Sequence, residues 1–109
     1  MASDIDLDTN FRFLGLTKEQ ANVLKESGIN CNFGTHFKTK AITGIVPLDS
    51  SVIAKIGEFM EQQKISNKDT DIFISFNTEY DTRVIDIPTY VNEAVISLGS
   101  KLVVSYTVL

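Results

Sequence analysis

Residues 40–62, K-A-I-T-G-I-V-P-L-D-S-S-V-I-A-K-I-G-E-F-M-E-Q, decide the fold that the sequence predicts. The first seven are mostly apolar and rich in β-branched residues, which is typical of a strand. A proline and several residues suited to cap a helix follow them. From residue 52 onward, apolar residues recur at helical spacing and share one face. The stretch therefore predicts a strand that leads into a helix with one buried face.

The rest of the second half contains further elements of both kinds. Alternating apolar and polar residues predict strands at 71–78, 83–87 and 101–109. A proline and a glycine bracket a helix with an apolar face at 88–98. In order, residues 40–109 read β-α-β-β-α-β, the split βαβ arrangement of ferredoxin-like folds. We therefore expect an α+β fold, with an antiparallel sheet and both helices on one face.

Residues 1–39 are predicted to be an N-terminal extension of that core. Within it, T-K-E-Q (17–20) is a capping-box pattern: Thr17 caps the helix and Gln20 reaches back to the cap. Gly28 suits the left-handed turn that ends such a helix. The length of 109 residues suits one domain, so we expect 1–109 to fold as a single unit.

Two further stretches of the extension resemble strands. F-R-F-L (11–14) predicts an added edge strand. N-C-N-F-G-T-H-F-K (30–38) alternates as well, so residues 30–46 form either one long bent strand or a hairpin. The sheet face opposite the helices is predicted to be polar, and we expect residues 1–39 to cover it.

The N-terminal run D-I-D-L-D places Asp4, Asp6 and Asp8 on one side of a strand-like segment. A calcium loop of the EF-hand type requires a glycine and a bidentate glutamate at fixed positions, where this chain has Thr9 and Gly15. A metal site is therefore not expected. The favoured interpretation is a solvated acidic terminus, and contact with a basic partner is the alternative.

The sequence predicts no catalytic, cofactor or metal site, and so no enzyme. Cys31 and His36 are the only residues of their types, and on a straight strand they point to opposite faces. Glu79 and Asp81 form a carboxylate pair, but they lie in a predicted turn, where like charges are usually solvated. None of the phosphate-binding, dinucleotide-binding or serine-nucleophile glycine motifs occurs.

Charge and composition narrow the expected partners. The net charge is −4, so the protein repels phosphate backbones and attracts basic proteins. The single cysteine rules out an internal disulfide. No apolar run approaches the roughly 18 residues of a membrane span, and no secretory signal is recognised at the N-terminus. We expect a cytoplasmic protein that binds neither nucleic acid nor membrane directly.

Three stretches carry a resemblance to a known class: A-I-T-G-I-V-P-L-D-S-S-V-I-A-K-I-G-E-F-M-E-Q-Q (41–63), D-I-F-I-S-F (71–76) and V-N-E-A-V-I-S-L-G-S-K-L-V-V-S-Y (91–106). Together they resemble small bacterial immunity proteins, the cognate inhibitors of polymorphic and contact-dependent growth-inhibition toxins. The resemblance implies an acidic protein that binds one toxin domain, often a nuclease, and blocks it by protein–protein contact.

If the function is of the immunity type, we expect the partner to bind at carboxylates that lie beside an aromatic anchor. The candidate partner-binding residues are Asp69, Asp71, Glu79, Tyr80 and Asp81. Two other functions stay open. One is a phage- or element-encoded inhibitor of a nucleic-acid-binding defence protein. The other is a small-ligand-binding module or an enzyme of ferredoxin-like fold, which requires a pocket with perturbed titratable groups.

Overall fold

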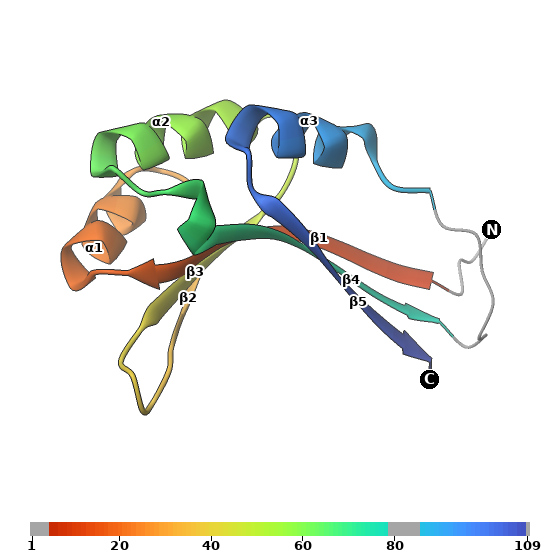
Figure 1. Cartoon of the computed structure of the whole chain (residues 1–109), viewed down its shortest axis with the longest axis horizontal. Helices are drawn as coiled ribbons and strands as arrows, with labels where there is room; N and C mark the ends of the chain where they lie inside the picture. Colours follow the sequence, from red (N-terminus) through yellow and green to blue (C-terminus); the bar gives the residue numbers. More distant parts are fainter. Residues whose placement is uncertain (1–4, 79–85, 109) are drawn as a thin grey trace.

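The computed structural model describes residues 5–78 and 86–108, and its fold is α+β. One mixed sheet is formed by β1 (Ile5–Leu16), β2 (Asn32–Thr35), β3 (Ile42–Pro47), β4 (Thr70–Thr78) and β5 (Lys101–Val108). Its upper face in Figure 1 carries α1 (Lys18–Glu26), α2 (Ile53–Gln63) and α3 (Thr89–Leu98). A short 3₁₀ helix, η1 (Asn67–Asp69), precedes β4.

The strand order is β2-β3-β1-β4-β5, which differs from the predicted ferredoxin-like order. β1 lies in the middle and runs antiparallel to β3 and to β4. β3 and β4 are therefore parallel to each other and one strand apart, as predicted for the strands on either side of α2. β4 and β5, by contrast, are adjacent and parallel, so the sheet is mixed and the prediction of an antiparallel sheet was wrong.

The central position of β1 corrects the prediction that its residues form an acidic terminus and an added edge strand. Leu7, Thr9, Phe11 and Phe13 all point to the helix-covered face, and the two phenylalanines are fully buried. Residues 5–16 therefore form one strand, with a register shift between Phe13 and Leu16, and this strand extends the sheet and does not cover it. Asp8, on the opposite face of β1, is exposed.

The strand predicted at 83–87 has no counterpart among the described residues. Residues 79–85 lie outside them, and Asp86 and Ile87 are not in a strand. The strand that lies between β3 and β4 is β1, not the strand predicted at 83–87. Because sequence neighbours were assumed to pair, the prediction overlooked the pairing of the N-terminal strand with two distant ones.

The helices follow their sequence signals closely. The capping box at Thr17 and Gln20 is confirmed, with hydrogen bonds of 3.1 and 2.9 Å in the two directions. α3 ends at Gly99, whose φ of +66° is left-handed, as predicted for a terminating glycine. Residues 30–46 form a hairpin, the second of the two predicted alternatives, with β2 antiparallel to β3.

One apolar core lies between the helices and the sheet. Phe11, Phe13 and Phe59 pack edge to face, with ring centroids 5.0 and 5.3 Å apart. The hydroxyl groups of Thr9 on β1 and Tyr90 on α3 are 2.8 Å apart, so a hydrogen bond ties this helix to the central strand. Within the described residues, no helix is long and apolar enough to cross a membrane.

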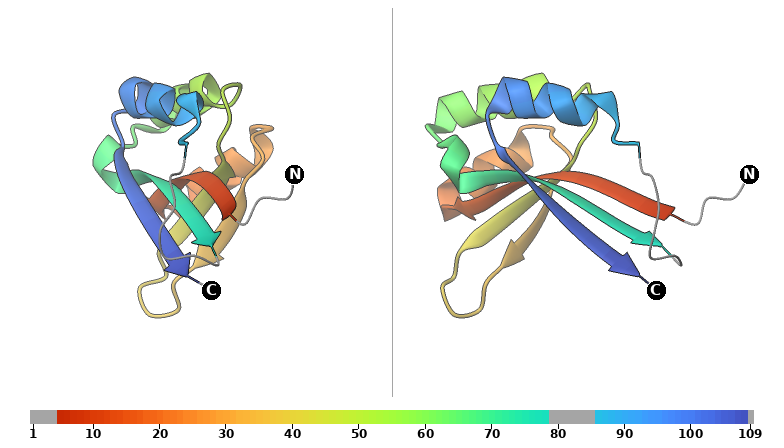
Figure 2. Two further views of the ribbon diagram at one scale, coloured as in Figure 1. Left: turned by 90° about the vertical axis from the view of Figure 1, so that its right-hand side faces the viewer. Right: turned by 45° about the vertical axis from the view of Figure 1, so that its right-hand side comes forward.

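The sheet twists strongly toward its β5 edge. Figure 2 shows β5 sloping away from α2 and α3 as it approaches the C-terminus. Twist is the normal consequence of L-residue sterics, and it accumulates across neighbouring strands. The helices therefore cover the central strands and leave the corresponding face of β5 partly exposed.

Candidate functional site

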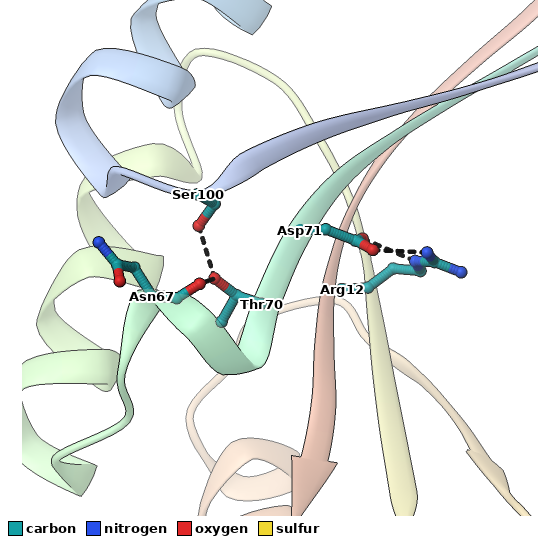
Figure 3. Close-up of polar contacts among 5 residues, drawn as sticks. All are labelled: Arg12, Asn67, Thr70, Asp71 and Ser100. Carbon is teal, nitrogen blue, oxygen red and sulfur yellow. Dashed lines mark hydrogen bonds and ion pairs between the residues drawn. The ribbon is translucent and has the colours of Figure 1, made fainter.

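Asp71 is buried and does not contribute to an exposed acidic surface. Its side chain is 2% exposed, and both carboxylate oxygens accept hydrogen bonds from Arg12, at 2.7 and 2.6 Å (Figure 3). The hydrogen bond and the charge of Asp71 raise the pKa of Arg12 despite its partial burial. A carboxylate held this way is not free to bind a partner, so Asp71 is not part of an exposed binding surface.

Of the remaining candidate residues, only Asp69 belongs to the described part of the chain. Asp69 is exposed in η1, directly before β4. Glu79, Tyr80 and Asp81 lie outside the described residues, and they follow Thr78 at the other end of the strand. A strand of this length spans about 30 Å. Asp69 and the end of β4 that leads to the predicted turn are thus too far apart for one compact patch.

The other chemically notable residues are separated too. Cys31 packs against the apolar core near Gly44. Burial raises the pKa of its thiol, and a backbone hydrogen bond at Ile45 has a smaller, opposite effect. His36 lies in the turn of the hairpin, where its Nδ1 accepts hydrogen bonds from two backbone N–H groups at 3.3 Å. Asp4 and the side chain of Asp6 are not among the parts of the chain that the structure describes. Among the described residues, no group of three His, Cys, Asp or Glu side chains could hold a metal ion.

A row of uncovered apolar side chains lies along β5. Each is between 42% and 52% exposed: Leu102, Val104, Tyr106 and Val108. The pairing register aligns this row with Ile72, Ile74, Phe76 and Thr78 of β4, so it is the outer margin of the core face. Phe76 and Tyr106 pack edge to face at 4.9 Å. The row continues the hydrophobic core to the edge of the sheet without a helix above it.

The backbone of β5 is exposed as well. In the described part of the chain β5 pairs with β4 alone, so half of its N–H and C=O groups point away from the sheet. After Lys101 the strand reads L-V-V-S-Y-T-V, without a charge, a proline or a glycine. Natural proteins usually protect exposed edges with one of those devices. The β5 edge, defined as residues 101–108, is thus suited to pair with another strand.

The β5 edge was visible in the sequence only in part. The alternation of its apolar residues was predicted, and so was their shared face. Its position at the edge depends on the pairing of β1 with β4, which no local signal indicates. What the sequence did show is the absence of charge over residues 102–108. In an edge strand that absence is unusual, whereas in a central strand it is expected.

The described geometry combines an open strand edge with four half-exposed apolar side chains. Such an edge accepts a strand from another protein by β-augmentation, in which backbone hydrogen bonds provide affinity and side-chain contacts provide specificity. Comparison with protein-family models, with curated proteins and with solved structures gave no match to this chain.

Proposed function

We propose that the protein is an immunity-type inhibitor, which binds a toxin domain and neutralises it by protein–protein contact at the β5 edge. The observation that carries this proposal is the row Leu102, Val104, Tyr106 and Val108. These side chains are half exposed on a strand that pairs on one side only among the described residues. An apolar row of this kind is stabilised when a partner removes it from water, at about 25 cal/mol for each Å² covered. The partner would add a strand and place apolar side chains over the row.

The charge of the chain supports a basic partner. Its net charge of −4 attracts a positively charged protein and accelerates encounter. Toxin domains that cleave RNA or DNA need a basic cleft to hold phosphates, so they fit this requirement. The attraction would act mainly on the association rate, whereas the apolar row would set the lifetime of the complex.

One exposed carboxylate, Asp69, lies near the start of the β5 edge, and two more follow β4 in the sequence. β4 and β5 are parallel, with Asp71 opposite Lys101 and Thr78 opposite Val108. Asp69 therefore lies at the end where β5 begins. The segment that contains Glu79 and Asp81 follows Thr78, at the end where β5 finishes. We infer that these carboxylates act at the polar rim of the interface, around the apolar row.

The test is a protection assay with the toxin domain encoded next to the gene of this protein. Co-expression should restore growth of cells that produce the toxin domain, and the two proteins should purify together. Leu102→Lys and Val104→Lys should each weaken the complex at least about 30-fold, because each would bury a charge within the apolar row. Thermal unfolding of each variant establishes that it still folds.

The matched control is Ile96→Lys on α3. Ile96 is 83% exposed and belongs to α3, not to the β5 edge, so the same chemical change should leave protection intact. Unaltered toxicity in the presence of the wild-type chain would contradict the proposal. Equal loss of binding in the β5 variants and in the control would contradict the choice of surface. Specific capture of a DNA-binding defence protein in place of a toxin would favour the alternative inhibitor function.

A further inference from the structure

A groove lined by lysines separates α1 from the β2–β3 hairpin. It encloses about 520 Å³, within the range of small-molecule sites. Its polar margin consists of Thr17, Lys18, Asn22, Lys25, Thr35 and Lys40. Its apolar surface is provided by Leu16, Ala21, Phe33 and Ile42. Among the residues that the structure describes, no acidic residue lines this groove, although the chain has 14 acidic and 10 basic residues.

The charge of the groove follows from how α1 divides its side chains. Lys18, Asn22 and Lys25 are spaced four and three residues apart, so they share the face toward the hairpin. Glu19 is not among the groove residues, and Glu26 lines a different hollow, toward α2. The helix therefore directs its positive charges into the groove and keeps its negative charges out of it.

The hairpin supplies the third ammonium group and an aromatic ring. Lys40 has a left-handed φ of +61°, and its backbone N–H donates to the carbonyl of His36 at 2.8 Å, which closes the turn. Phe33 lies below Lys25, whose Nζ is 5.2 Å from the ring centroid. Within the described residues, no carboxylate forms an ion pair with the three groove lysines. Their charges are available to a ligand.

We infer that this groove binds a small organic anion, a phosphate or carboxylate carried on a flat apolar body. The ammonium groups would hold the anion and the hydroxyl and amide groups of the margin would complete its hydrogen bonds. The apolar surface with Phe33 would take the flat body. The inference is independent of the toxin-binding proposal, because it concerns the opposite edge of the sheet.

Phenyl phosphate and benzoate are suitable probes, since each joins one of the two anionic groups to a flat ring. The measurement is a titration of the amide resonances of the full chain. Inorganic phosphate and phenol are the separate halves of phenyl phosphate, and formate and benzene are those of benzoate. We expect one or both probes to shift amides of α1 and the hairpin. The effective probe should bind at least about tenfold more tightly than either half alone.

The variant Lys18→Gln/Lys25→Gln should weaken the effective probe about tenfold or more, because two charged hydrogen-bond donors are lost. Lys40→Asn, which suits a left-handed φ, should weaken it with no loss of folding. Lys68→Gln removes one positive charge in η1, as Lys40→Asn does in the groove, and this control should bind as the wild type does. Shifts elsewhere on the chain, or equal affinity in the double variant and the control, would overturn the inference. Probes that bind no more tightly than their separate halves would also overturn the inference.

Discussion

Arg12 and Asp71 face each other across β1 and β4, joined by two N–H···O hydrogen bonds of 2.7 and 2.6 Å. The guanidinium of Arg12 also lies 4.2 Å from the centroid of the Phe73 ring. A bidentate pair of this geometry favours one register, because a slip of β1 by one residue would place Arg12 and Asp71 on opposite faces of the sheet. The pair thus helps to fix the register of β1 against β4.

Replacing Arg12 with leucine should lower the free energy of unfolding by about 3 kcal/mol, since the buried carboxylate of Asp71 then lacks its partner. The double variant Arg12→Leu/Asp71→Leu should be more stable than that single variant, because it also removes the orphaned charge. Urea unfolding measures both values. A single variant no less stable than the Lys68→Gln surface control would refute the structural role of the pair.

Two helix ends have a left-handed residue that favours glycine, so removing glycine from one and adding it to the other should change stability in opposite directions. At Gly99 a Cβ atom would lie 2.8 Å from Nδ2 of Asn67, and φ is +66°, so Gly99→Ala should cost about 1–2 kcal/mol. Lys64 ends α2 with a φ of +54°, a conformation that glycine adopts more easily. Lys64→Gly should therefore stabilise the protein by up to about 1 kcal/mol. Changes of the same sign would contradict these assignments.

The thiol of Cys31 should react slowly in the folded protein. Burial raises its pKa above the ordinary value of 9.0, so the reactive thiolate is scarce at neutral pH. We expect iodoacetamide to modify the unfolded chain faster than the folded chain at the same pH. Equal rates would show that burial does not protect this thiol.

The same shift has a consequence for stability at high pH. As the pH rises past 9.0, the unfolded chain loses the Cys31 proton before the folded chain does. Loss of this proton favours the unfolded state. The free energy of unfolding of the wild type, minus that of Cys31→Ser, should therefore decrease as the pH rises in this range. Parallel unfolding curves for the two proteins from neutral to alkaline pH would contradict this linkage.

Local signals in the sequence predicted the helices well. The capping box at Thr17, the proline before α3 and Gly99 each act within a few residues, so their effects are readable without the fold. The strand registers are different. β1 pairs with residues about 60 positions away, and its alternating carboxylates look like those of a solvated terminus. The signal that could have corrected this is Phe11 and Phe13, on the same face as Leu7.

The candidate site was predicted less well, for a related reason. Asp71 looks like an exposed strand-entry carboxylate until Arg12 is placed beside it, and that neighbour comes from the other end of the chain. The lysine spacing on α1 can be read from the sequence. The groove cannot, because Lys40 joins it through the hairpin. Sites that combine distant segments need the sheet topology first.

Amide hydrogen exchange of the chain, with and without its toxin domain, tests most directly whether the β5 edge is the binding surface. If it is, outward-facing amides within residues 101–108 should exchange more slowly in the complex, because a partner strand takes their hydrogen bonds. The other sheet edge, β2, is the internal control and should exchange at the same rate in both states. Unchanged exchange along β5, with protection confined to β2 or to the helices, would contradict the proposal.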